Sequence, residues 1–455
     1  MTGLAIARME LLEALRQPRS LAIALVALFF FAVAFHQGAA RVAGEAALID
    51  GAVAENRRAW LAQKPQNPHG AAHFAVLLAK PPAPLGGLVI GVDGALAGHV
   101  YTDAHRLVPA TGGRSADLPF AEAVGTLDVA FVVGAVLPLL AVLLGSDLVA
   151  GEKERGTLRL VFANPVGRSR WLLVRWAGRT LTFLALVAGA AGVAWLSQGA
   201  PPLGDAGRLA AFAGLSGLYL AAWVAIGAAC SAFADRLAAA SVAAIALWIG
   251  LVIVAPRVMA AVAELGDPAP LTSPARMNAR VEDLRLQRKQ LAMVAALKAK
   301  GALKDASAVV AAEGPAAVRE AIDAEAARAR ARAEAPAEAW RARQLGKLAW
   351  LAPLSPAALY FQAAAGLAGT DGARHAAFLA QAMAWRQAFL DQLNALEDRK
   401  VSVFKDYASV APFAFTEAPA AEVWRDQAPR VGGLLATGFL ALGLALWRFR
   451  RYDLR

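Results

Sequence analysis

The chain has 455 residues, of which 58% are hydrophobic and 18% charged, and its mean hydropathy is +0.47. Soluble globular proteins average about 45–50% apolar and about 25% charged residues, so this composition excludes an ordinary soluble protein and indicates a multi-pass membrane protein. The single cysteine, Cys230, excludes an intrachain disulfide.

The positive charge is concentrated in a few short segments. Of the net +11, nine charges belong to residues 1–19, 151–179, 235–236 and 448–455. An excess of Lys and Arg beside apolar spans marks the cytoplasmic side, so these segments are predicted to be cytoplasmic. No basic patch interleaved with aromatic residues occurs, and no nucleic-acid partner is predicted.

The chain begins with a segment, residues 4–18, that is predicted to form an amphipathic helix in the membrane interface. A plain cytoplasmic segment leading into the first span is the alternative. Residues 21–35 are the first apolar run, which is short for a span of about 20 residues. A cleaved signal peptide is the competing interpretation, because small residues follow at 38–40. The acidic residues of the leader argue against it.

Residues 37–125 are polar and rich in Pro and Gly, which predicts an external loop or small domain, with a possible helix at 46–61. The second span is predicted at 127–149. Pro138 could kink it. Asp128 and Asp147 would lie at its two ends, where hydration of a charge costs little.

The third to fifth spans are predicted at 171–197, 209–233 and 237–255, with a short turn between the last two. Residues 256–430 form a second external region, in which the Ala, Arg, Glu and Lys of 276–343 favour helix. The sixth span is predicted at 431–447.

The predicted fold is thus an all-α integral membrane protein with six transmembrane helices, a cytoplasmic coupling helix and two external insertions, the second largely helical. Its divisions are 1–36, 37–125, 126–255, 256–430 and 431–455.

The most basic cytoplasmic segment runs from Asp147 to Arg179, between two apolar spans. Its interior predicts one helix over 152–162, whose apolar face would comprise Leu158, Val161 and Phe162. Asn164 and Pro165 would end that helix. A helix of about ten residues is marginal alone, which favours a partner surface. An ordinary charged loop is the alternative.

This organisation resembles the permease subunits of type-2 ABC transporters. The charged segment matches the family's E-x-E-x-G-T-L…P coupling pattern through Asp147, Glu152, Glu154, Gly156, Thr157, Leu158 and Pro165. One departure is that Arg175 stands where the family pattern has Lys. The resemblance implies that a separate ATP-binding subunit docks on this segment. The residues expected to contact it are Glu152, Glu154, Arg155, Gly156, Thr157 and Leu158.

A second stretch, residues 355–386, is similar to a motif of a bacterial subfamily whose large external domain has no known function. The residues that carry this likeness are Ser355, Pro356, Ala368, Gly369, Thr370, Asp371, His375, Phe378 and Arg386.

No catalytic or cofactor motif is found in the chain. A phosphate loop of the form G-x-x-x-x-G-K-[ST] is missing, so ATP has to be used by a partner subunit. His69 and His73 have helical spacing, but no Glu lies beside His69 as a metalloprotease motif would require. Surface histidines are the default interpretation, and an external metal site with His99 and His105 stays open.

The resemblance, taken with the missing phosphate loop, implies a non-enzymatic permease subunit of an ABC transporter, of the exporter type, in the bacterial inner membrane. The charge distribution predicts that both termini are cytoplasmic. Its expected partners are an ATP-binding subunit, a second permease copy or homologue, and the lipid membrane. The alternative is a component that transmits force or a signal to an external partner without moving a substrate. The spans contain no charge that would select an ion, and the substrate is not predicted.

Overall fold

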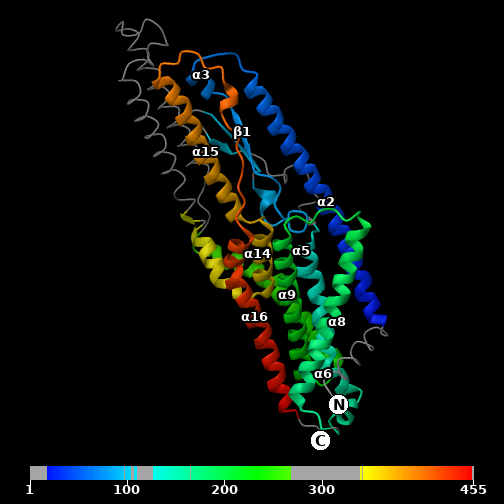
Figure 1. Ribbon diagram of the computed structural model, residues 1–455. Helices are drawn as coiled ribbons and strands as arrows, with labels where there is room; N and C mark the ends of the chain where they lie inside the picture. Colours follow the sequence, from blue (N-terminus) through cyan, green and yellow to red (C-terminus); the bar gives the residue numbers. More distant parts are fainter. Residues whose placement is uncertain are drawn as a thin grey trace.

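The computed structural model describes residues 18–96, 98–103, 107–109, 127–163, 165–267, 339–340 and 342–452. Six helices in these ranges are long and apolar enough to cross a membrane, which confirms the predicted number of spans and the all-α class. Apart from the second half of α2, which continues upward, they form the lower part of the molecule in Figure 1. Their bounds are Pro18–Leu61 (α2), Val129–Glu154 (α5, η3 and α6), Arg168–Ser197 (α8), Ala206–Phe233 (α9), Leu237–Glu264 (α10, η4 and α11) and Ala420–Arg450 (α16).

The centre of the bundle is the contact between α6 (Leu137–Glu154) and α9. Gly145 of α6 and Gly227 of α9 face each other so closely that a Cβ on either would meet backbone atoms of the other helix. Small residues allow helix backbones to approach where lipid gives no hydrophobic drive for association. These two glycines therefore fix the crossing on which the other spans pack.

Two spans contain a π-helical segment that is separated by one residue from a following proline. The π-helix η3 (Val132–Val136) precedes Pro138, and η4 (Ile249–Val254) precedes Pro256. Proline removes a backbone donor and clashes with the preceding turn, and a π-helical turn relieves this constraint. The predicted irregularity at Pro138 therefore takes the form of a π-helix.

The π-helical carbonyls are bonded by side chains of other elements. The Tyr219 hydroxyl donates to Gly134 O at 2.8 Å, and the Trp248 indole donates to Ala135 O at 3.0 Å. The Ser355 hydroxyl donates to Leu251 O at 2.7 Å. Bonds of this kind compensate for backbone groups that a proline leaves without a helical partner.

A short helix of the second insertion lies in the bundle core. Helix α14 (Pro356–Ala368) packs between α9 and α16, where the fully buried ring of Tyr360 stacks on Tyr219 with centroids 4.4 Å apart. At 13 residues it is shorter than a span. Helix α14, which belongs to the predicted external region 256–430, thus shares its core with the spans.

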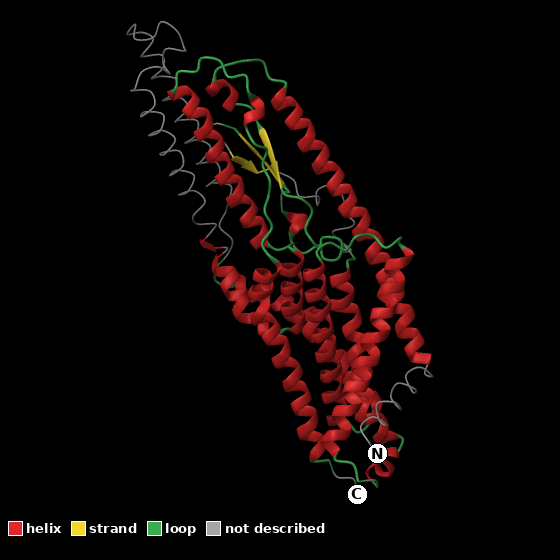
Figure 2. Cartoon of the chain, in the orientation of Figure 1, coloured by secondary structure: helices red, strands yellow, loops and turns green. Residues whose placement is uncertain are grey.

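The two insertions together form a domain at the far end of α2, which we call the distal domain (Figures 1 and 2). Its core comprises an antiparallel sheet in the order β1-β2-β3, in which Leu78 pairs with Val100. The sequence predicted no sheet here. Its elements are the second half of α2, α3 (Pro68–Ala72), β1 (Val76–Ala79), η1 (Asp93–Ala95), β2 (His99–Thr102), β3 (Leu107–Pro109), α15 (Gly372–Asp398) and η7 (Tyr407–Ser409).

Two aromatic clusters hold the distal domain together. Trp60 of α2 packs against Phe389 of α15 and Tyr407 of η7, and its indole donates to Tyr407 O at 2.8 Å. The second cluster joins the sheet to α15 through Leu78, Val100 and Phe378. The described part of the first insertion thus forms a structured layer against α15.

Asp267 ties the end of α11 (Ala255–Glu264) to a helix at 342–351. Its carboxylate accepts two hydrogen bonds from Arg343, at 3.1 and 3.0 Å, and one from Lys347 at 3.4 Å. Hydrogen bonding to Arg343 lowers the pKa of this carboxyl group. The interfacial helix predicted at 4–18 and the helices predicted over 276–343 lie almost wholly outside the described residues.

Candidate coupling interface

The charged segment is built from two helices, and the single helix predicted over 152–162 is wrong. Helix α6 continues to Glu154, and α7 (Thr157–Phe162) follows after a turn at Arg155 and Gly156. Gly156 has φ +71°, a left-handed conformation that is unfavourable for residues with a Cβ. The Thr157 hydroxyl donates to the Glu152 carboxylate across this turn.

Behind the turn lies a buried ionic cluster. Asp147 of α6 is 4% exposed and accepts hydrogen bonds from Arg19 of α2 at 2.7 Å and from Arg179 of α8 at 3.2 Å. Glu152 accepts from Arg175 of α8 at 2.8 Å. Buried charges are tolerated when they are paired and hydrogen-bonded. The expectation that Asp147 would be easily hydrated is wrong, because α2 and α8 cover it.

The same segment bonds to the ends of three further helices. Lys153 donates to Ala234 O at 2.9 Å, just after α9, and the Glu154 carboxylate accepts from Leu237 N at 2.9 Å, at the start of α10. Arg168 donates to Arg450 O at 2.8 Å, at the end of α16. Charged side chains at helix ends satisfy backbone groups that have no intrahelical partner. The charged segment thus belongs to α6 and α8 and is hydrogen-bonded to α9, α10 and α16. Through Arg19 it is also bonded to α2, so a displacement of the segment would act on all six spans.

Helix α7 lies on the bundle by the apolar face that the sequence predicted. Leu158 is 3% exposed, and Val161 and Phe162 pack against the main core. The Phe162 ring lies 5.7 Å from that of Trp171 and 5.9 Å from that of Phe449. Helix α7 therefore packs against the start of α8 and the end of α16.

The six predicted contact residues divide into two groups. Glu152 and Leu158 point into the protein and Thr157 is partly buried, so these three support the turn from inside. Glu154, Arg155 and Gly156 are exposed. Two residues that the prediction missed, Arg159 and Leu160, are also exposed, and Leu160 is 71% exposed. The helical spacing that places Leu158, Val161 and Phe162 inward already required Leu160 to point outward.

The second predicted motif forms a corner between α14 and α15. Ser355 caps α14, with its hydroxyl oxygen accepting from Ala358 N at 3.1 Å, and Pro356 occupies the first turn. Gly369 ends α14 with φ +72°, and Thr370 N donates to Ala365 O at 2.9 Å. Left-handed glycines of this kind are common helix ends.

The corner continues into the distal domain. Asp371 caps α15 by accepting from Arg374 N at 3.1 Å, and Arg386 Nε donates to Asp103 O at 3.2 Å. Val92 N of the first insertion donates to Thr370 O at 2.9 Å. His375 lies half-buried on α15, and its pKa is lowered by burial and by the positive charge of Lys80. The motif residues thus join the bundle to the distal domain.

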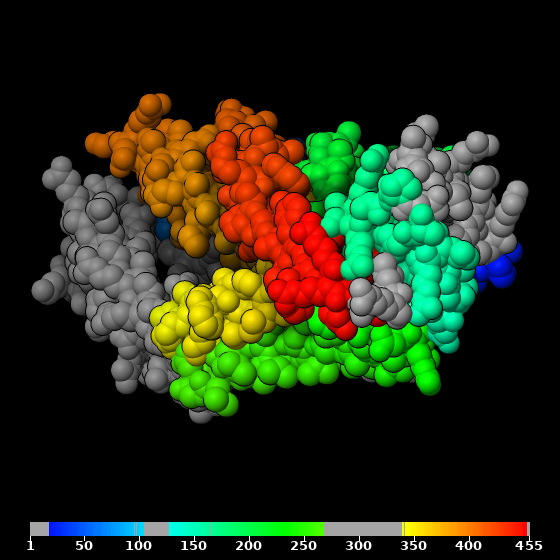
Figure 3. Space-filling model, turned by 90° about the horizontal axis from the view of Figure 1, so that it is seen from below, coloured from blue at the N-terminus to red at the C-terminus, as the bar shows by residue number. Residues whose placement is uncertain are grey.

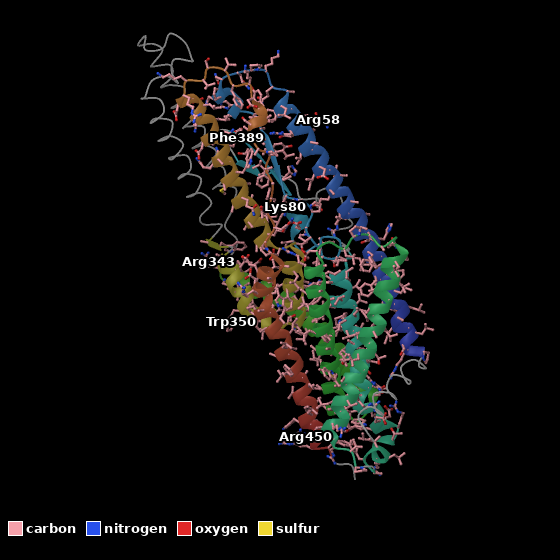
Figure 4. All side chains as sticks on the ribbon, viewed as in Figure 1. Arg58, Lys80, Arg343, Trp350, Phe389 and Arg450 are labelled. Carbon is pink, nitrogen blue, oxygen red and sulfur yellow. The ribbon has the colours of Figure 1, made fainter. Side chains whose placement is uncertain are left out.

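A charge network that the sequence did not indicate secures this corner. Lys80 is 2% exposed and pairs with Asp93. Arg374 of α15 donates hydrogen bonds to both carboxylate oxygens of Glu417, which lies shortly before α16, and one to Pro81 O at 2.8 Å. Figure 4 labels Lys80 in the distal domain. No periodicity marks these residues, because they come from three distant segments.

The histidines form no cluster of three or more metal-ligating residues within the described part of the chain. His69 and His73 lie at the end of the molecule opposite the charged segment, with their Nε2 atoms 3.2 Å apart. His69 Nδ1 is 3.9 Å from the carboxylate of Glu397. His105 lies outside the described residues.

Comparison with known proteins matches residues 4–454 to the family described as "ABC-2 family transporter protein". The chain is also similar to a curated protein of Pseudomonas aeruginosa named "Probable ABC transporter permease protein NosY", with 36% identity over 122 residues. That similarity covers 25% of this chain and 43% of the relative, so the chain spans less than half of the relative's length.

Proposed function

The chain belongs to the ABC-2 family of transporter proteins and is a multi-pass membrane subunit, and from this premise we propose that it couples ATP hydrolysis in a separate subunit to movement of its spans. The observation that carries the proposal is the turn from Glu154 to Leu160, which is held against a buried ionic cluster and exposes Glu154, Arg155, Gly156, Arg159 and Leu160. We call this turn the coupling turn.

The coupling turn has the properties of a docking element. It presents the charges of Glu154, Arg155 and Arg159 beside an exposed leucine. Helix α7 has only six residues, and so short a helix needs tertiary support. Leu158 and Phe162 supply that support from the bundle side. A partner would complete it from the other side.

Force on the coupling turn would move α6 and α8 together. The pairs Asp147–Arg179 and Glu152–Arg175 lie at 3.2 and 2.8 Å and join these two helices behind the turn. Charge-assisted hydrogen bonds between rigid groups resist separation more than neutral ones. The sequence contains no phosphate loop, so the proposed energy source is ATP bound by another chain.

Helix α2 favours a second candidate function, the transmission of force to the distal domain. It has 44 residues and so a length of about 66 Å, well beyond the roughly 30 Å hydrocarbon core of a bilayer. Arg19 at one end bonds Asp147 in the coupling cluster, and Trp60 at the other end lies in the distal core. One helix therefore joins both ends of the molecule.

We further propose the partners and orientation that fit this role. A second permease copy or homologue would complete the pathway, export would be the direction, and both termini would face the cytoplasm of a bacterial inner membrane. Orientation can be tested with Leu61→Cys, at a position 45% exposed at the end of α2, and with Leu160→Cys. An impermeant thiol reagent applied to intact cells should label only the first. Labelling of the second alone would reverse the topology.

The coupling proposal is tested by Leu160→Ser in the complex with the ATP-binding subunit. Leu345→Ser is the matched control, because Leu345 is 67% exposed and lies between Arg343 and Trp350, which Figure 4 labels well away from the end that carries Arg450. Leu160→Ser should lower the permease-dependent ATPase rate several-fold while membrane insertion is retained. Glu154→Lys and Gly156→Pro should also uncouple. An unchanged rate in all three variants would contradict the proposal.

A further inference from the structure

The outer face of α16 ends in a pair of arginines beside exposed aromatic rings. Phe439, Leu440, Leu444 and Trp447 are 68%, 66%, 43% and 48% exposed. Residues 440, 444, 447 and 451 follow one another at spacings of four, three and four, which places them along one side of the helix. An exposed apolar stripe on a membrane span faces lipid, so Arg451 lies where that stripe meets the headgroup layer.

The last residue of α9 completes this feature. Phe233 is 50% exposed, and its ring lies 6.3 Å from that of Trp447. The Arg448 guanidinium lies over the Phe233 ring at 5.9 Å, and the Arg451 guanidinium lies over the Trp447 ring at 4.6 Å. We call these four residues the basic–aromatic corner. Figure 3 shows the end of α16 at the surface beside the green helices.

Among the residues that the structure describes, nothing occupies all the donors of either guanidinium group, which leaves donors for a ligand. Within the described residues neither Arg448 nor Arg451 has a carboxylate within ion-pair distance, and their side chains lie against ring faces. By contrast, Lys153 pairs at 3.6 Å with Asp235, whose side chain is 81% exposed. A stacked guanidinium is held in a defined orientation, and its planar set of donors matches the oxygens of a phosphate group.

We propose that the basic–aromatic corner binds the phosphate headgroup of an anionic phospholipid of the surrounding bilayer. The acyl chains would lie along the stripe of Phe439, Leu440 and Leu444. The rings of Phe233 and Trp447 would lie at the level of the lipid glycerol, and the two arginines would hold the phosphate. Aromatic rings and cationic side chains are preferred at this depth of a membrane.

Bound lipid would also stabilise the end of the molecule that carries the coupling turn. Arg168 donates to Arg450 O and to Tyr452 O, both at 2.8 Å, and Arg450 Nε donates to the Ser169 hydroxyl at 2.6 Å. These contacts join the start of α8 to the end of α16 on either side of Arg451. A headgroup held by Arg448 and Arg451 would steady this junction, and through it the start of α8.

The test uses the full chain purified in detergent micelles that contain equal amounts of phosphatidylglycerol and phosphatidylcholine, with retained lipid identified by native mass spectrometry. The wild-type chain should retain phosphatidylglycerol preferentially. Each arginine near an anionic surface contributes a factor of about five to binding, so Arg448→Gln/Arg451→Gln should weaken that preference about 25-fold. The control Arg57→Gln/Arg58→Gln removes the same charge at the distal end, where Figure 4 labels Arg58, and should leave the preference unchanged.

Two results would overturn the proposal. One is equal retention of the two lipids by the wild-type chain, and the other is an unchanged preference in the double variant. If that double variant also loses binding to the ATP-binding subunit, the corner is assigned to a protein contact instead. If the double variant fails to fold, Arg451→Gln alone, at an exposed position, should still lower the preference about fivefold.

Discussion

Different interactions stabilise the two ends of the molecule. At the coupling end, buried carboxylates and guanidinium groups link the spans through short directional contacts, as in Asp147–Arg179 at 3.2 Å. At the distal end, aromatic rings from the two insertions pack around Trp60. Charge-assisted hydrogen bonds hold the ends of helices at defined positions relative to one another. Close packing of aromatic rings instead joins segments that are distant in the sequence into one rigid unit. This difference fits a coupling end that receives displacement and a distal domain that moves as one unit.

The largest effect should come from breaking the ionic cluster. Asp147→Ala leaves Arg179 buried without its carboxylate, and removing one partner of a buried pair costs about 3–5 kcal/mol. Thermal unfolding in detergent should show a large loss of stability. Asp147→Ala/Arg179→Met should recover part of it, because the double variant no longer leaves a buried guanidinium at position 179 without its carboxylate. An equal loss of thermal stability in the double variant would mean that the stability of the cluster does not depend on the pairing of Asp147 with Arg179.

A smaller effect is expected from Trp60→Leu. This substitution removes part of a ring that is 2% exposed and the hydrogen bond to Tyr407 O, at a cost of about 2–3 kcal/mol. Limited proteolysis should then cleave the distal domain while the spans stay intact. Cleavage within the bundle under the same conditions would show that the two ends do not behave as separate units.

At the coupling turn, Gly156→Ala should act through backbone strain alone. A Cβ added to Gly156 would have no other atom within 4 Å, yet the φ of +71° costs a residue with a side chain about 1–2 kcal/mol. ATPase coupling should fall while the melting temperature changes little. The matched control is Gly167→Ala, at an equally open glycine without a positive φ. Equal effects of the two substitutions would argue against strain.

The smallest effect is a pH dependence at the corner between α14 and α15. The groups around His375 are Lys80, Asp93, Arg374 and Glu417, and the folded-state pKa of His375 lies below its ordinary value of about 6.5. The unfolded chain therefore binds more protons in the window below that value, so stability should fall as pH drops from about 6.5 toward the folded pKa. His375→Gln should flatten this slope in thermal unfolding measured between about pH 5 and pH 7. An unchanged slope would assign it to other groups.

The six spans could be predicted from the sequence, because a long apolar run has one stable structure in a membrane, the transmembrane helix. It was also sufficient for the buried face of α7, which depends only on helical spacing. It was insufficient for the sheet, whose strands have three or four residues and show no clear alternation. The position of α14, the burial of Asp147 and the network around Lys80 depend on contacts between segments far apart in the chain. Only the fold brings these segments together.

The central claim, that the coupling turn is a docking surface, is tested most directly by protection of a cysteine. In a Cys230→Ala background, Leu160→Cys would be labelled with a thiol reagent in the purified chain with and without the ATP-binding subunit, and Leu345→Cys would serve as control. The account predicts that the subunit slows labelling at position 160, as expected for a buried interface position, and leaves the labelling rate at position 345 unchanged. Equal labelling at position 160 with and without a bound subunit would contradict it.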